Sequence, residues 1–270
     1  MHRSRLRKHI RVVLRYARIK FKELTEYKVD FFVFMMTMSL WFISMFFYWR
    51  LILGPDGTIY GWTLPQLFLL PIFAEFIWAF FGLVFGGFYS LWRSLTDGGF
   101  DKYLARPMSG IIGHLSNHMD MWSFARVFLS LILIFIVALS FPAQVSIVGI
   151  FLAIILATLG AVAFGTIVGT FFLSAFWIGE NAFIDRIVDG IDRWARYPLD
   201  LFPKAFHYVF IFVFPIFFVT IWPVKLSFGG IAFSSAGWMM LGALGLIIFW
   251  GVLFSLILSR GLKKYESGGG

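Results

Sequence analysis

Residues 96–120 read TDGGFDKYLARPMSGIIGHLSNHMD and form the longest polar interruption between strongly apolar segments of this 270-residue chain. The stretch contains a Gly-Gly turn, an Arg-Pro break and two histidines four residues apart. Gly and Pro mark turns, and charged side chains are costly inside a bilayer. We therefore interpret this stretch as a water-exposed loop between membrane-spanning helices, where a soluble partner can contact the chain.

The composition on either side of this loop indicates an integral membrane protein. Hydrophobic residues make up 60% of the chain and charged residues only 14%, whereas a soluble domain is roughly half apolar and roughly a quarter charged. The chain has no cysteine, which excludes disulfides and cysteine-ligated metals. The net charge of +9 lies mainly beside the apolar segments, so we expect it to face membrane lipids and expect no nucleic acid partner.

Six apolar runs flank the polar segments. A helix of about 20 residues crosses the ~30 Å hydrocarbon core of a bilayer. The fold class that this predicts is all-α: a polytopic membrane protein whose six-span transmembrane domain occupies residues 31–259. The expected spans are residues 31–53, 67–92, 121–141, 145–178, 205–222 and 237–259.

Residues 1–30 have two stripes with helical spacing, one apolar and one basic. This pattern predicts an amphipathic interfacial helix that lies in the headgroup layer, and its charges also act as a positive-inside signal. The apolar stripe comprises Leu6, Ile10, Val13, Ala17, Phe21 and Leu24, and the basic stripe comprises Lys8, Arg11, Arg15, Arg18 and Lys22.

The distribution of Lys and Arg predicts the orientation of the chain. Ten of these 23 residues lie in 1–30, three in 93–120, four in 179–204 and three in the tail 260–270. The loops after the first, third and fifth spans contain only Lys225. We therefore expect both termini and the loops 93–120 and 179–204 in the cytoplasm.

The fourth span has a small residue at every fourth position, which allows another helix to approach closely. We interpret this stripe as intramolecular packing rather than as a dimer face. Its members are Ala153, Ala157, Ala161, Gly165 and Gly169.

His114, His118 and Asp120 are the strongest candidates for a metal site. Two imidazoles four residues apart share one helix face, but two histidines and a loosely placed carboxylate are too few ligands. We therefore assign no metal here. The two histidines read better as part of an ordinary polar helix face.

Asp97-Gly98 followed by Ala105-Arg106 is similar to the motif of alcohol phosphotransferases that make phospholipids. The gap is six residues rather than two, and the later carboxylates do not fit; Asp185 and Asp189 miss in the same way. Wrong spacing turns carboxylates away from a shared Mg²⁺. A membrane-embedded enzyme acting on lipid headgroups stays open as the alternative function.

Glu75 is the one carboxylate of the second span. Ionisable groups inside spans usually face a cavity or a partner. Glu75 could line a translocation pathway, take up a proton, pair across an interface or form a structural hydrogen bond between helices. Arg126, near the start of the third span, is expected to extend its side chain to the headgroup layer.

No phosphate-binding loop of the form G-x-x-x-x-G-K-[ST] occurs in the sequence. This chain therefore does not hydrolyse ATP alone. An ATP-driven process would need a separate polypeptide.

Three short segments resemble the permease subunits of bacterial type-2 ABC exporters, in the six-span branch associated with antibiotic and multidrug export. They are GFDKYLARP at 99–107, RYP at 196–198 leading to FP at 202–203, and GLKKYES at 261–267. A basic helix before the first span also fits. The resemblance extends over essentially the whole chain.

The resemblance implies a non-catalytic permease in a bacterial cell (inner) membrane, which pairs with an identical or sibling permease and exports an amphipathic, lipid-like or drug-like substrate. It implies ATPase subunits that carry ATP and Mg²⁺, with no cofactor on this chain. Short cytoplasmic coupling helices, the first at 100–118 and the second within 181–196, would contact those ATPases. The implied coupling residues are Phe100, Asp101, Lys102, Leu104, Arg106 and Pro107.

Overall fold

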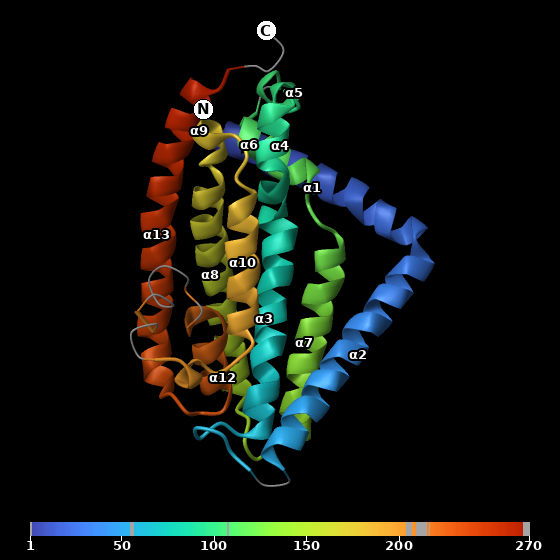
Figure 1. Cartoon of the computed structure of the whole chain (residues 1–270), viewed down its shortest axis with the longest axis vertical. Coiled ribbons are helices and arrows are strands. Elements are labelled where there is room, and N and C mark those ends of the chain that lie inside the picture. The colour runs from blue at the N-terminus through green and yellow to red at the C-terminus, as the bar shows by residue number, and fades with distance from the viewer. Residues whose placement is uncertain are drawn as a thin grey trace.

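The computed structural model shows a bundle of helices (Figure 1). It describes residues 2–54, 57–106, 108–203, 207–208, 215 and 217–266. No strand occurs within these ranges, where the one β-type contact is an isolated bridge between Ile59 and Trp62. The all-α prediction is therefore confirmed for the described part of the chain.

Five helices among the described residues are long and apolar enough to cross a membrane. They match five of the six predicted spans. They are α2 (Lys28–Leu53), α3 (Leu64–Phe85) continued by η1 (Gly86–Ser90) and α4 (Leu91–Thr96), α7 (Trp122–Ser140), α8 (Ile147–Phe172) continued by α9 (Ala175–Ile178), and α13 (Phe233–Lys264).

Half of the predicted span at 205–222 lies outside the described residues. Its described end is the π-helical segment η3 (Phe217–Ile221), which leads into α12 (Trp222–Ser227). Both short elements pack against α8.

α3 lies at the centre of the bundle and packs against both α7 and α8. The close approach of α3 to α8 depends on glycine. A Cβ added at Gly165 would come within 2.2 Å of the Phe85 ring, and one at Gly169 within 2.6 Å of the Phe88 ring. All five members of the small-residue stripe are buried within the chain, so the prediction of intramolecular packing is confirmed.

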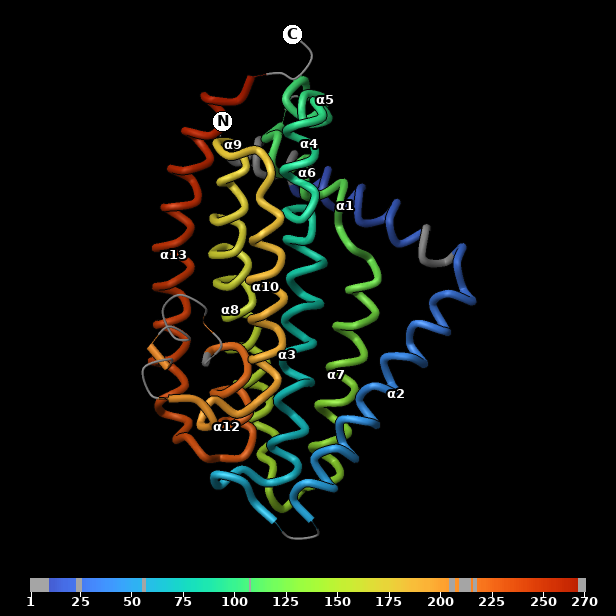
Figure 2. Tube along the Cα trace, viewed as in Figure 1, coloured from blue at the N-terminus to red at the C-terminus, as the bar shows by residue number. Residues whose placement is uncertain are grey.

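α1 (His2–Glu26) crosses one end of the bundle, and α2 runs from the far end of α1 back along the other helices (Figure 2). The predicted N-terminal helix is thus confirmed as a helix. Among its described side chains, α2 buries only Phe42 and Trp49. α2 is therefore the most peripheral of the helices that pack on α3.

The loop 93–120 folds into α5 (Asp101–Leu104) and α6 (Gly110–Asn117). Figure 1 shows these helices at the same end of the bundle as α9 and the end of α13. α1 packs against α6 there. The polar stretch between two spans is thus a folded cap rather than an extended loop.

The segment 179–204 departs from the sequence expectation of a loop beside 93–120. Its helix α10 (Ala182–Ala195) runs along α3 and α8 toward the opposite end of the bundle (Figure 1). The next element, η2 (Leu199–Leu201), contains Asp200, which accepts a 2.6 Å hydrogen bond from the Trp62 indole N–H. Trp62 lies in the connection between α2 and α3, at that opposite end. α10 packs along the bundle because it has a buried apolar stripe at helical spacing. The stripe comprises Ile184, Val188, Ile191 and Ala195.

We expect Gly165→Ala to destabilise the protein by about 1–3 kcal/mol, because the new methyl group overlaps the Phe85 ring. Gly245→Ala on α13 is the matched control, since a Cβ there meets nothing within 4 Å. The control is expected to leave stability unchanged or to raise it by up to about 1 kcal/mol, because Ala favours a helix more than Gly does. Reversible unfolding of the detergent-purified protein measures both, and equal stabilities would contradict the packing argument.

Candidate functional site

The folded cap is anchored by two aromatic side chains that are fully buried, Phe100 and Tyr103. The Phe100 ring lies 6.1 Å from the Phe176 ring of α9 and 5.7 Å from the Tyr265 ring, between ring centroids. Aromatic pairs at these distances add to the burial of apolar area. The cap is therefore packed onto the ends of both α8–α9 and α13.

Two polar contacts tie the cap to distant parts of the chain. The Tyr265 hydroxyl donates a 2.9 Å hydrogen bond to Asp101, and the Arg106 guanidinium donates one to the Tyr16 hydroxyl of α1. Burial and the neighbouring Asp101 carboxylate raise the pKa of Tyr265 to about 12, so its phenol stays a donor at neutral pH. The cap thus links the N-terminal helix with the end of α13.

Of the six predicted coupling residues, three have side chains exposed on the cap. These are Lys102, Arg106 and Leu104, which is 45% exposed. Phe100 points into the core, and Asp101 is half-buried against Tyr265. Pro107 lies outside the described residues.

His114 and His118 both use ring nitrogens for backbone contacts. Because a carbonyl oxygen only accepts, the His114 Nε2–H donates to Gly87 at 2.9 Å, and the His118 Nδ1–H donates to the His114 carbonyl at 3.0 Å. Burial and the neighbouring His118 lower the pKa of His114 to about 4. The pair therefore fixes the cap on η1 with a neutral His114.

Asp120 accepts hydrogen bonds from Ser123 and the Trp122 backbone, at the start of α7. Asp97 lies in the turn after α4, whereas Asp185 and Asp189 lie on α10. Among the described residues, no group of three or more His, Asp or Glu side chains is placed to share a metal ion. The carboxylates of the phosphotransferase-like pattern are thus distributed over separate elements.

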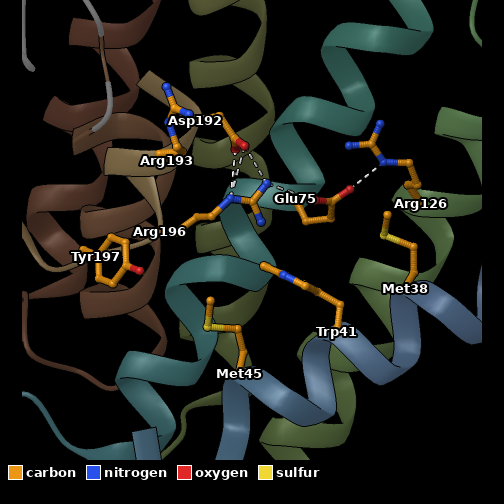
Figure 3. A pocket seen from close by; sticks show the side chains of 9 residues that line it. All are labelled: Met38, Trp41, Met45, Glu75, Arg126, Asp192, Arg193, Arg196 and Tyr197. Atoms are coloured by element: carbon orange, nitrogen blue, oxygen red, sulfur yellow. Dashed lines mark hydrogen bonds and ion pairs between the residues drawn. The ribbon is translucent and has the colours of Figure 1, made fainter. Parts of the chain in front are cut away.

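Glu75 lies at the centre of an ion-pair network inside the bundle (Figure 3). Its side chain is 4% exposed, and Arg126 of α7 donates from Nε to Oε1 at 2.5 Å. Arg196 Nη2 lies 3.4 Å from Glu75 Oε2 and 2.7 Å from Asp192 Oδ2. Two carboxylates and two guanidinium groups therefore neutralise one another between α3, α7 and α10.

The network lines a cavity of about 510 Å³. α2 forms the facing wall, and the Arg196 guanidinium lies 4.7 Å from the centre of the Trp41 ring. A volume in this range holds a small molecule. The lining residues are Met38, Trp41, Met45, Glu75, Arg126, Asp192, Arg193, Arg196 and Tyr197 (Figure 3).

A family model described as "ABC-2 family transporter protein" matches residues 35–269. The chain belongs to the ABC-2 transporter family. No curated protein and no solved structure matches it.

As an ABC-2 membrane subunit, the chain is a non-catalytic part of a transporter, and its family implies ATPase partners in general. The alternative of a membrane-embedded enzyme acting on lipid headgroups is therefore wrong. The five candidate spans agree with a multi-pass membrane protein.

The structure corrects the interpretation of Arg126. Sequence reasoning placed its guanidinium in the headgroup layer, but an intramolecular carboxylate lies within hydrogen-bond distance. Of the interpretations left open for Glu75, the structure shows the hydrogen bond between helices, with Arg126 as the donor. Glu75 also lines a cavity.

Sequence reasoning missed Arg196 as a partner of Glu75, and Asp192 as the second carboxylate that Arg196 pairs with. Their one sequence signal is the i,i+4 spacing of opposite charges on an amphipathic segment. That spacing indicates that Asp192 and Arg196 pair with each other, but it does not show that Arg196 also contacts Glu75, which lies 121 residues away in the sequence.

We expect Glu75→Gln to destabilise the ABC-2 subunit by about 3–5 kcal/mol, because Arg126 and Arg196 lose a buried counter-charge. Asp30→Asn, at an exposed position of α2, is the control and is expected to change stability by less than about 0.5 kcal/mol. Thermal or denaturant unfolding in detergent compares the two. Equal changes in stability for the two variants would show that the ion pairs of Glu75 do not stabilise the fold.

We expect acidification to loosen the cap. The unfolded chain binds a proton at His114 below its ordinary pKa of about 6.5, whereas the folded chain does so only near pH 4. The contribution of the neutral His114 to the free energy of unfolding is therefore lost as the pH falls from about 6.5 to 4. Hydrogen exchange of α6 amides at pH 7 and pH 5 measures this, and His114→Gln is expected to show a smaller pH dependence. Identical pH profiles would remove His114 as the cause.

Proposed function

We propose that this chain is the membrane-spanning permease of an ATP-driven exporter in a bacterial cell membrane. It pairs with a second permease, identical or sibling, and moves an amphipathic, lipid-like or drug-like substrate outward. ATP and Mg²⁺ are bound by separate ATPase subunits that contact the cap. The family assignment supports the transport role, and the positions of Lys and Arg support a cytoplasmic cap.

The observation that carries the coupling proposal is the anchoring of the cap. Phe100 is packed against α9 and the α13 terminus, Arg106 is bonded to α1, and Leu104 is left exposed. Close-packed interiors transmit displacement rather than absorb it. A force applied at α5 therefore reaches the long helices α8 and α13 together.

The mechanism follows from this connection. Nucleotide-driven closure of the ATPases displaces the cap, and the long helices carry the displacement to the route between the two permeases. The interface between the permeases is the two-state element, and the nucleotide state sets its equilibrium. Glu75 lines the cavity beside this path, so we also expect Glu75→Gln to alter export.

We expect Leu104→Asp to reduce ATP-driven export by about tenfold, the effect of roughly 1.4 kcal/mol on a contact with the ATPase. Leu104 is a cleaner target than Asp101 or Arg106, because changing those residues also removes internal hydrogen bonds. Export is measured in vesicles with the co-purified ATPase.

Tyr60→Asp is the matched control, an exposed apolar residue exchanged for Asp in the connection at the other end of the bundle. Its backbone φ of 51° is one that Asp tolerates. We expect normal export and normal ATPase co-purification for this variant. Unchanged export in Leu104→Asp, or purification without any chain carrying a phosphate-binding loop, would refute the coupling proposal.

A further inference from the structure

We propose that the charged cavity binds a single-chain anionic amphiphile. Its oxyanion headgroup, a phosphate or a carboxylate, lies against the arginines, and its hydrocarbon chain lies along α2. The inference rests on the proposed function, because it names the substrate class of the exporter. It is carried by the charge balance, the available donors and the apolar wall of the cavity.

The lining of the cavity has an excess of positive charge. Glu75 and Asp192 are already paired with Arg126 and Arg196. Arg193 also lines the cavity, so the lining contains three arginines and two carboxylates. An anionic group is therefore attracted to this site, and a cationic group is repelled.

Two arginines also have hydrogen-bond donors to spare. Arg196 uses Nε and Nη2 in its ion pairs, but its buried Nη1 has no hydrogen-bond partner in the described part of the chain. Arg193 is exposed three residues earlier on the same helix and is in none of the ion pairs found among the described residues. A buried donor without a partner is unfavourable, and the planar guanidinium fork fits phosphate and carboxylate oxygens. An oxyanion would satisfy both groups.

The opposite wall is apolar and adaptable. Met38, Trp41 and Met45 follow one another at helical spacing on one face of α2. Unbranched methionines adjust to chains of different shape. Figure 3 shows these three side chains facing the arginines across the cavity. The site thus offers a polar side for a headgroup and an apolar side for a chain.

The position of α2 gives the hydrocarbon chain a path out of the cavity. Only Phe42 and Trp49 of its described residues are buried, and the apolar residues around them are exposed or half-buried. A chain longer than the cavity can therefore extend along α2. Free inorganic phosphate would use the arginines alone and leave this wall without a contact.

The test is equilibrium binding to the purified full-length chain in neutral detergent, without ATP or ATPase. Octyl phosphate is titrated, and binding is followed by calorimetry and by the rise in the unfolding midpoint. Octyltrimethylammonium has the same chain with the opposite charge, and inorganic phosphate has the same oxyanion without a chain. We expect saturable binding of octyl phosphate, with at least about tenfold weaker binding of either comparison compound.

Arg193→Gln is the decisive variant, because it leaves the Glu75 network intact. We expect it to weaken octyl phosphate binding by about tenfold, the size of a lost hydrogen bond to a charged group. Arg186→Gln is the matched control, since Arg186 is exposed two turns earlier on α10 and does not line the cavity. Arg193→Lys retains the charge and is expected to restore most of the binding even if the glutamine variant is unstable.

Three results would overturn the proposal: no saturable binding, equal binding of the cationic amphiphile or of inorganic phosphate, or equal weakening by Arg186→Gln. The test is independent of the coupling experiment. If octyl phosphate binding depends on Arg193 but Leu104→Asp leaves export unchanged, the coupling proposal is rejected and this inference stands. Normal coupling without binding would reject this inference alone.

Discussion

A carboxylate buried among apolar helices requires a positive partner, and the arrangement of α3, α7 and α10 meets this requirement at Glu75. The charged form of an isolated Glu side chain is strongly disfavoured away from water. Arg126 and Arg196 approach the carboxylate from two different helices, and Asp192 balances the second guanidinium. The network therefore fixes which helices are neighbours and which faces they turn inward.

The same network explains how a polar segment can run along a membrane bundle. α10 has a buried apolar stripe on one side, and Arg196 pairs both with Asp192 and with Glu75. Local pairing reduces the desolvation penalty of both charges. A helix with this many charged residues can thus pack against α3 and α8 without leaving its network charges unpaired.

α3 also connects the cavity with the cap. It continues through η1, where the Phe88 ring packs against Gly169 and His114 bonds to the Gly87 carbonyl. A displacement of the cap is therefore felt along the helix that carries Glu75. The two sites are thus joined by one continuous helical segment, α3–η1.

The sequence by itself determined the membrane class, most of the spans, the small-residue stripe of the fourth span and the family of this protein. These features are local, because an apolar run of about 20 residues or a small residue at every fourth position is sufficient to define them. Only the tertiary structure decided that Arg126 pairs with Glu75 rather than reaching the headgroup layer, and that residues 182–195 run along the bundle. Helical periodicity shows which face of a segment is buried, but not which segment covers it. The partners of Glu75 lie 51 and 121 residues away, and such contacts are chosen by the packing of the whole bundle.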